Sequence, residues 1–307
     1  MFCYQCQEAA GNKGCTNIGV CGKTAQTSSL MDALVLVSKG IATVAEKALA
    51  DGQNIASATK FLPRAMFATI TNVNFDNDRL IELINEALNI RAELISQTGF
   101  EITADAHQAL TWAPGSLSLE MAIPEAAGVL DTEDEDIRSL RELLMYGIKG
   151  LCAYGDHAAV LGYEKDELNN FVVKALAASI KEMPVDHLIA LVLECGEKGV
   201  GVMALLDEAN TTTYGHPEIT SVNIGVGTRP GILISGHDLK DMHELLEQTR
   251  DSGVDVYTHG EMLPAHYYPA FKKYDHFVGN YGGSWWKQES EFETFNGPIL
   301  MTTNCIT

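Results

Sequence analysis

The sequence is poor in the features that mark membrane, secreted and fibrous proteins. It contains no run of 18 or more uncharged apolar residues, so no membrane-spanning helix is expected. The first residues, Met-Phe-Cys-Tyr-Gln-Cys, include neither a basic residue nor an apolar core. No signal peptide is therefore predicted, and a cytoplasmic location is expected. Internal repeats and low-complexity tracts are also absent, which argues against repeat and fibrous architectures.

Positive charge is scarce. The 307 residues include 21 lysines and arginines against 41 acidic residues, which gives a formal net charge of −20. A surface this acidic repels nucleic acids and anionic lipids, so neither a nucleic acid nor a membrane is expected as a partner. Hydrophobic residues make up 46% of the chain, and the length is sufficient for two ordinary domains with a sizeable core.

The cysteines are odd in number and unevenly placed. There are seven, and four of them fall within the first 21 residues: Cys3, Cys6, Cys15 and Cys21. Because the count is odd and the expected compartment is reducing, a disulfide framework is a poor explanation for them. Residues 1–26 show no hydrophobic period and are predicted to form an irregular loop that needs a metal to hold it. Cys152 and Cys195 lie in apolar helical segments, where buried packing is expected.

Residues 1–215 are predicted to form a mainly α-helical domain. Apolar residues recur every three or four positions in six segments, roughly 28–48, 60–72, 78–97, 135–151, 165–182 and 186–208. Ser29 with Asp32, and Thr132 with Glu135, have the spacing of a helix-starting capping box. Six helices fit two bundles of three.

Residues 216–307 are predicted to form part of an α/β domain. Strands are expected at 231–236, 254–258 and 298–302, with helices at 238–250 and 269–277 between them. This alternation favours a doubly wound parallel sheet, which is expected to be truncated because three strands leave unpaired edges. In such sheets the chemistry lies beyond the carboxyl ends of the strands. His237, Glu261 and Cys305 follow the three expected strands in turn.

The four N-terminal cysteines have the spacing Cys3-x2-Cys6-x8-Cys15-x5-Cys21, which predicts a metal centre. An iron–sulfur cluster and a structural zinc both use four thiolates in a roughly tetrahedral array. Zinc sites usually have two close pairs, and here only the first pair is close, so an iron–sulfur cluster is favoured. Zinc and unligated thiols remain the alternatives.

His237, Glu261 and Cys305 form a second candidate set. Each alone is better explained as an ordinary packed or solvated residue, but their shared position after strands raises the case for a site. Imidazole, carboxylate and thiolate together suit iron better than zinc and leave room for open positions. His259 and His266 flank Glu261 and are either proton donors for this site or structural histidines.

Four segments of the sequence together resemble the hybrid cluster protein (prismane) family. They are the start Met-Phe-Cys-Tyr-Gln-Cys-Gln-Glu-Ala-Ala, Ser-Gly-His237-Asp-Leu, Tyr-Thr-His259-Gly-Glu261-Met-Leu-Pro-Ala-His266, and Leu-Met-Thr-Thr-Asn-Cys305. The resemblance covers the whole chain, and its motifs are long and specific. The family is related in fold to the nickel–iron carbon monoxide dehydrogenases.

The resemblance implies a helical domain of three-helix bundles followed by α/β domains. It implies that Cys3, Cys6, Cys15 and Cys21 hold a 4Fe-4S cluster that passes electrons, because their gaps are similar to those of the four-iron type. His237, Glu261 and Cys305 would be three ligands of a hybrid 4Fe-2O-2S cluster. The implied activity is reduction of hydroxylamine to ammonia and of nitric oxide to nitrous oxide, with electrons from a reductase or a ferredoxin.

The family's remaining hybrid-cluster ligands, further cysteines and another glutamate, follow the position of Cys305. This chain is therefore expected to carry only part of that site. Two functions are compatible with that expectation. The first is a hydroxylamine or nitric oxide reductase of the hybrid cluster type. The second is a non-catalytic single-cluster module for electron transfer or redox sensing.

Overall fold

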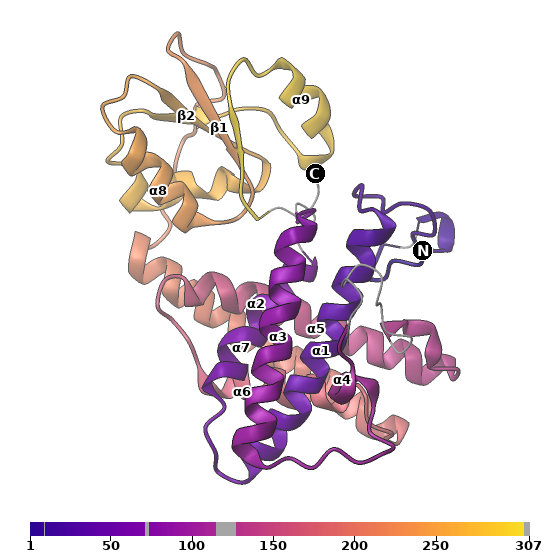
Figure 1. The fold of residues 1–307 in the computed structure, drawn as a ribbon. Coiled ribbons are helices and arrows are strands. Elements are labelled where there is room, and N and C mark those ends of the chain that lie inside the picture. Colours follow the sequence, from indigo (N-terminus) through magenta and orange to yellow (C-terminus); the bar gives the residue numbers. More distant parts are fainter. Residues whose placement is uncertain (9, 71–73, 115–126, 304–307) are drawn as a thin grey trace. The chain divides into compact units, whose positions relative to one another are not determined.

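A computed structural model describes residues 1–8, 10–70, 74–114 and 127–303 of the chain. The chain divides into two compact units. Unit 1 comprises Met1–Ile70, Asn74–Asp156 and Glu164–Met203. Unit 2 comprises Thr71–Val73, His157–Tyr163 and Ala204–Thr307. Unit 1 is helical, and unit 2 contains the strands (Figure 1).

The six predicted helices are present, and each differs from its predicted range by a few residues at one or both ends. They are α1 (Ala25–Ala50), α2 (Ala56–Ile70), α3 (Asn77–Thr98), α5 (Glu135–Ala159), α6 (Asp166–Ala178) and α7 (Val185–Tyr214). A short helix, α4 (Gln108–Thr111), was not predicted. Four residues are too few to show a helical period in the sequence, which explains why this helix was missed.

Two of the predicted helix starts were wrong. α1 begins before the Ser29 pair, because the Thr24 hydroxyl accepts a hydrogen bond from the Thr27 amide at 3.2 Å and caps the helix there. α5 is capped by Asp134, whose Oδ1 accepts from the amides of Asp136 and Ile137 at 3.0 Å each, and not by Thr132. In both cases a neighbouring short polar side chain with the correct backbone geometry takes the capping position.

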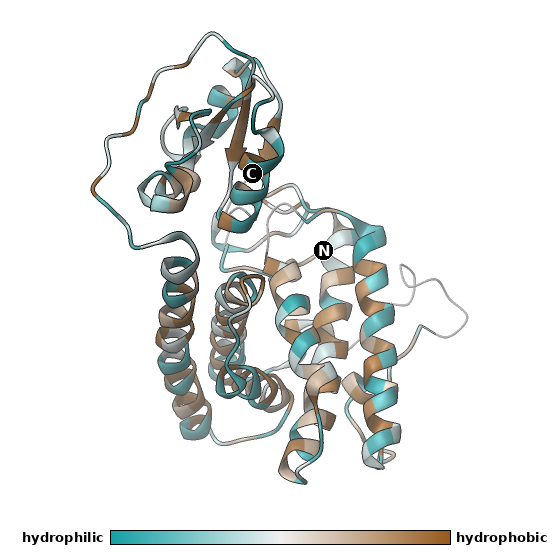
Figure 2. Cartoon of the chain, turned by 90° about the vertical axis from the view of Figure 1, so that its left-hand side faces the viewer, coloured by the Kyte–Doolittle hydropathy of each residue, from teal (hydrophilic) through white to brown (hydrophobic). Residues whose placement is uncertain are grey.

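The core of unit 1 is built around α1. Its apolar residues, including Leu30, Leu34 and Ile41, are fully buried, and α1 packs against α2, α3, α4 and α6. By length and composition α1 could also cross a membrane, but 78% of its most apolar window is buried inside the protein. Figure 2 shows hydrophobic and hydrophilic residues on different sides of these helices, as expected for helices that share a core.

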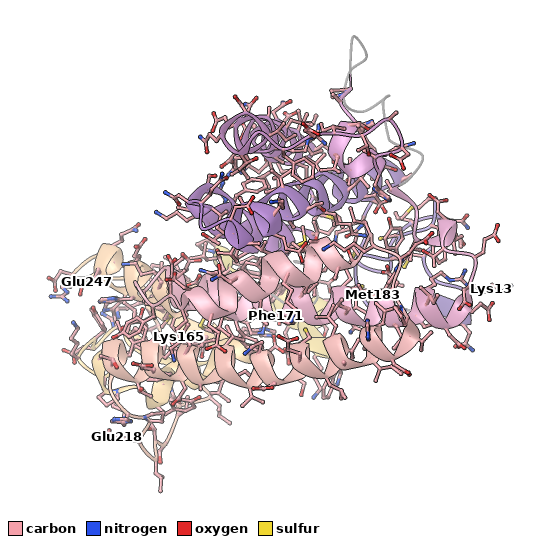
Figure 3. All side chains as sticks on the ribbon, turned by 90° about the horizontal axis from the view of Figure 1, so that it is seen from below. Lys13, Lys165, Phe171, Met183, Glu218 and Glu247 are labelled. Atoms are coloured by element: carbon pink, nitrogen blue, oxygen red, sulfur yellow. The ribbon has the colours of Figure 1, made fainter. Side chains whose placement is uncertain are left out.

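α6 connects the two predicted groups of helices. It packs against α1 and α2, and Phe171, which is labelled in Figure 3, is buried at 3% exposure. α5 approaches α7 closely, since a Cβ atom on Gly147 would lie 2.7 Å from the Cys195 sulfur. Cys152 and Cys195 are both buried, which confirms their predicted packing role. The division into two three-helix bundles stays a prediction.

Unit 2 contains a four-stranded, all-parallel sheet in the order β3-β2-β1-β4. The strands are β1 (Gly231–Ser235), β2 (Asp255–His259), β3 (Phe277–Asn280) and β4 (Ile299–Met301). The helices are α8 (Leu239–Thr249) and α9 (Gln288–Thr294). The predicted parallel sheet is confirmed, and its three predicted strands correspond to β1, β2 and β4.

The segment between β2 and β4 differs from the prediction. Instead of a helix at 269–277, it contains the 3-10 helices η5 (Gly260–Tyr267) and η6 (Pro269–Phe271), followed by β3. Its third 3-10 helix, η7 (Trp285–Lys287), and α9 then lead to β4. Pro269 gave the helix prediction because proline favours the first turn, but the segment has no continuing apolar period.

The two faces of the sheet are covered by different elements. One face packs Ile234 and Val256 against α8, η5 and η6, in a cluster that includes Met242, Phe271 and Tyr214. On the other face, Tyr257 contacts Phe295, and His259 contacts Phe292 of α9. This alternation along β2 is the two-residue period of a strand.

Candidate functional site

The strand order reverses beside β1. The chain passes from β1 to β2 to β3 on one side, then returns to place β4 on the other side of β1. In open parallel sheets, ligands bind beyond the carboxyl ends of the strands at such a reversal. Gly236 and His237 follow β1 there, and Thr302 and Thr303 follow β4.

His237 and Glu261 meet at this edge. His237 Nε2 lies 2.7 Å from Glu261 Oε2, and the two side chains are 36% and 34% exposed. Glu261 comes from η5, directly after β2. Two of the three residues predicted for the second site are therefore in contact. Cys305, the third, lies outside the described residues.

The contacts of His237 show which of its ring nitrogens carries the hydrogen and which faces Glu261 with a lone pair. Nδ1 lies 2.8 Å from the carbonyl oxygen of Thr303, which can only accept, so Nδ1 carries the hydrogen in the neutral ring. Nε2 then points a lone pair at the Glu261 carboxylate. Two electron-pair donors this close require a proton or a metal ion between them, and a carbonyl that accepts from Nδ1 is the usual arrangement of a metal-binding histidine.

Glu261 Oε2 also fits a metal ligand. The atom is buried, and among the residues that the structure describes it has no aligned hydrogen-bond donor despite its closeness to His237. A buried carboxylate oxygen without a donor is unfavourable unless a cation binds it. The residues present therefore fit an iron-containing group, although two ligands alone do not enclose one.

The end of β4 is held to the start of α8. The Thr302 amide donates to the Ser235 carbonyl oxygen at 2.9 Å, and the Asp238 amide lies 3.4 Å from the Thr302 hydroxyl. His157 Nε2 lies 3.2 Å from the Thr303 hydroxyl, and its Nδ1 lies 3.5 Å from Asp238 Oδ2. These contacts fix the Thr303 carbonyl that orients His237.

His259 and His266 have structural contacts in this fold. His259 is fully buried, with Nδ1 at 3.2 Å from the Ser235 hydroxyl and Nε2 at 2.8 Å from Glu291 Oε2. His266 Nε2 lies 2.8 Å from the Thr258 hydroxyl, and its ring stacks on Phe277 with centroids 3.9 Å apart. Burial lowers the pKa of His266 to about 4, so its ring is neutral at neutral pH.

Glu291 is the residue near this site that sequence reasoning missed. Its Oε2 contacts His259, and its Oε1 accepts from the Gly283 amide at 3.0 Å. It lies on α9, 32 positions after His259 along the chain. The local sequence Gln-Glu-Ser-Glu-Phe-Glu contains three similar glutamates, so nothing in it distinguishes the one that turns inward.

The four N-terminal cysteines lie in the predicted irregular loop. The backbones of Cys3 and Cys15 form an isolated antiparallel β-bridge, in which the Cys3 amide donates to the Cys15 carbonyl oxygen at 3.0 Å. All four are free thiols: Cys15 is buried, and Cys3, Cys6 and Cys21 are partly buried. A Cβ atom on Gly19 would lie 3.2 Å from the Cys21 sulfur, so a larger residue there would be in tight contact with that thiol. Burial raises the pKa of the Cys6 thiol.

Over the described ranges, no group of three or more His, Cys, Asp or Glu side chains is close enough to hold a single metal ion. The loop brings the cysteine-bearing segments together without bringing their sulfur atoms to one point. The thiolates of a four-iron cluster each bind a different iron, so they lie further apart than the ligands of one zinc ion. The preference for an iron–sulfur cluster over zinc at these four cysteines stays a prediction from their spacing.

The loop is attached to the helices of unit 1 through Gln5. The Gln5 side chain donates to Asp32 Oδ1 on α1 and accepts from Lys149 Nζ on α5 at 2.6 Å. Lys149 Nζ also donates to the Gln5 carbonyl oxygen at 2.9 Å. Burial raises the pKa of Asp32 to about 7 and lowers the pKa of Lys149 to about 7. The segment between Cys3 and Cys6 thus rests on a buried polar network.

Comparison with known proteins gives one family and several named relatives. The profile of the Prismane/CO dehydrogenase family matches residues 1–307. A protein named hydroxylamine reductase from Desulfosudis oleivorans is 56% identical over 308 residues, which cover 100% of this chain and 56% of the relative. Proteins of the same name from Caldanaerobacter subterraneus and Nitratidesulfovibrio vulgaris are 57% and 55% identical, with 57% of each relative covered. The chain thus spans between half and two thirds of the length of these relatives.

Proposed function

Because the chain belongs to the Prismane/CO dehydrogenase family, we propose that it functions as an iron–sulfur oxidoreductase that reduces hydroxylamine to ammonia and water. This reaction consumes two electrons and two protons for each N–O bond that is broken. Nitric oxide is a second substrate of the same class, two molecules giving nitrous oxide and water for two electrons and two protons. The observation that carries the proposal is the approach of His237 Nε2 to Glu261 Oε2 at the strand-order reversal.

In this proposal Cys3, Cys6, Cys15 and Cys21 hold a 4Fe-4S cluster that receives electrons from a reductase or a ferredoxin. His237, Glu261 and Cys305 supply three ligands of a hybrid 4Fe-2O-2S cluster, and this chain alone provides only part of that site. When bound, the hybrid cluster supplies coordinatively unsaturated iron for a small N–O compound. Free thiols in one loop and the buried Glu261 oxygen support these assignments.

The protein's own residues fix the position and direction of the ligand atoms at this site. Thr303 fixes His237 through Nδ1, so Nε2 keeps one direction. Both His237 and Glu261 are about one third exposed, which allows a small substrate to reach them from solvent. Glu261 Oε2 and His237 Nε2 converge on one position, which iron would occupy in place of a shared proton when the cluster is bound. The cytoplasm is the expected location for a protein of this kind.

The test is hydroxylamine-dependent oxidation of a reduced dye by the anaerobically purified protein, supplied with the segment that carries the remaining hybrid-cluster ligands. His237→Ala and Glu261→Gln should each lower this activity by at least about 100-fold, because loss of even an outer partner of a metal ligand costs about 10–100-fold. His216→Ala and Glu244→Gln, two exposed residues away from the site, are the matched controls and should retain it. Equal activity in the site variants and the controls would contradict the assignment.

A second candidate function is a single-cluster module for electron transfer or redox sensing. It is favoured by the contrast between four free cysteines in one loop and a second site where two of the predicted ligands, His237 and Glu261, are in contact. About four irons per chain, without hydroxylamine turnover, would support the module, whereas about eight would support two bound clusters. A colourless protein that contains zinc would contradict both functions.

A further inference from the structure

Two lysines are buried beside the cysteine loop. Lys23 is 3% exposed and follows Cys21 by two residues, and Lys149 is 1% exposed in the middle of α5. Lysine is among the residues least often buried, because taking an ammonium out of water costs several kcal/mol unless an anion compensates it. In a protein with only 21 basic residues, two buried lysines at one loop need an explanation.

The contacts of Lys149 do not provide a compensating charge. Its Nζ donates to the Gln5 carbonyl oxygen at 2.9 Å and to Gln5 Oε1 at 2.6 Å, and both acceptors are neutral. Within the residues that the structure describes, Lys149 has no carboxylate within 4 Å. The ammonium is thus hydrogen-bonded but lacks an ion-pair partner.

The carboxyl groups that face Lys149 from further away are poor counter-ions. They are Asp32 of α1 and Glu142 of α5, and burial raises the pKa of both. Lys39 of α1 faces the same two carboxyls and adds a further positive charge. Burial lowers the pKa of both lysines as well, so what distinguishes Lys149 is its geometry: it is buried, and its Nζ donates to two neutral acceptors of Gln5.

A further anion for Lys149 can come from the loop itself. Both acceptors of Lys149 belong to Gln5, the residue between Tyr4 and Cys6, and Cys3 is two positions before it. Gln5 is 1% exposed, so the lysine and this segment share an interior where charges interact strongly. Thiolates that bind a cluster would carry the negative charge that Lys149 lacks.

We infer that Lys149 is a positioning residue for the N-terminal cluster: it fixes the loop at Gln5 and places a buried positive charge behind the cysteine thiolates. The inference rests on the proposed cluster at Cys3, Cys6, Cys15 and Cys21. One-electron reduction adds one negative charge to that cluster. A nearby positive charge in a low-dielectric interior stabilises the reduced form, so Lys149 raises the reduction potential.

The experiment compares three single variants of the full chain, purified anaerobically. Lys149→Met removes the charge and the hydrogen bonds, and Lys149→Gln removes the charge but keeps a donor. Lys47→Met removes a charge from an exposed lysine, 60% exposed and paired with Asp51, as the matched control. Iron and sulfide are counted in each protein, and the cluster is then titrated with dithionite at fixed potentials.

In both Lys149 variants the reduction potential of the cluster should fall. At a fixed potential, the ratio of oxidised to reduced cluster should rise at least tenfold, which corresponds to about 59 mV for a one-electron couple. Lys47→Met should match the wild-type protein.

An unchanged potential in both Lys149 variants overturns the inference. A shift in Lys149→Met alone also overturns it, because it would assign the effect to the hydrogen bonds. If a Lys149 variant loses its cluster while its metal-free form melts like the wild type, the positioning role is supported. Loss of the cluster from Lys47→Met as well overturns it. A wild-type protein without iron and sulfide would instead contradict the proposed function.

Discussion

His237 contacts a carbonyl oxygen at one ring nitrogen and a carboxylate at the other. The carbonyl of Thr303 removes the freedom of the ring to exchange tautomers, because only an N–H can face it. His259 also contacts a carboxylate, that of Glu291, but its other ring nitrogen faces the Ser235 hydroxyl, and His266 faces the Thr258 hydroxyl. The nature of each partner, rather than the presence of an imidazole, decides which histidine can act as a ligand.

The stability of unit 2 should depend on pH through His266. Its pKa is lowered to about 4 by burial, against about 6.5 in the unfolded chain. As the pH falls from about 6.5 to about 4, the unfolded chain takes up a proton that the folded protein does not, so the free energy of unfolding falls. The loss is about 3 kcal/mol at most. Urea unfolding should show this extra loss in the wild type and not in His266→Gln, and equal pH profiles would contradict it.

Residue positions were predictable from the sequence where a local rule applied. His237 and Glu261 were predicted because each follows a strand, and parallel strands end at one edge. Glu291 and the Lys149–Gln5 contact could not be predicted in this way. The latter joins residues 144 positions apart, and such a contact depends on how helices pack, which leaves no local pattern in the sequence.

Helix contacts in unit 1 depend on one glycine in α1. A Cβ atom on Gly40 would lie 1.9 Å from the Ala109 carbonyl oxygen of α4. The same carbonyl accepts from Arg91 Nη1 at 2.7 Å, and Arg91 Nη2 donates to the Trp112 carbonyl at 2.6 Å. α4, although only four residues long, is thus held between a glycine of α1 and an arginine of α3.

Gly40→Ala should lower the free energy of unfolding by about 3 kcal/mol, because the added methyl group forces α1 and α4 apart. Gly196→Ala is the matched control. Gly196 is an exposed helical glycine, and a Cβ atom added there would have nothing within 4 Å, so the change should raise stability by up to about 1 kcal/mol. Chemical unfolding followed by far-UV circular dichroism measures both. Similar effects of the two substitutions would show that helix propensity, not packing, dominates.

Elements were predictable in proportion to their length. The six long helices were identified because their apolar residues repeat over several turns. β3 was missed because Phe277-Val-Gly-Asn280 is short and contains a glycine, which is unfavourable in strands. The 3-10 helices η5 and η6 have no apolar period: η5 was not predicted, and η6 was predicted as part of a helix at 269–277.

At the scale of the whole molecule, the acidic surface and the two cores are separate features. The net charge of −20 determines whether charged partners are attracted or repelled, and it says little about the fold. Each unit has its own buried core, one around α1 and the other on the sheet. The predicted domain limits, 1–215 and 216–307, remain a prediction, as does the expectation that neither nucleic acids nor membranes are partners.

Two cores should give two unfolding transitions in calorimetry. Gly236→Ala should lower the midpoint of one transition, because Gly236 has a φ of 132° and its Cβ atom would lie 2.0 Å from the Thr302 hydroxyl oxygen. Gly40→Ala should lower the midpoint of the other. Gly253→Ala is the control for backbone strain alone, since its φ is +79° and nothing lies within 4 Å of the added atom. A single transition that all three variants shift equally would contradict independent units.

The row Ser235, His259 and Glu291 has the order of partners found in a hydrolase charge relay: a hydroxyl, an imidazole and a carboxylate. The burial of Ser235 and His259 rules out a hydrolase role for the three residues. Ser235 and His259 are 2% and 0% exposed, so no ester or peptide bond can reach the hydroxyl. The row instead braces β1 and β2 against α9. A search for enzymes by side-chain geometry alone would count this brace as a serine hydrolase, and solvent access is the property that separates the two.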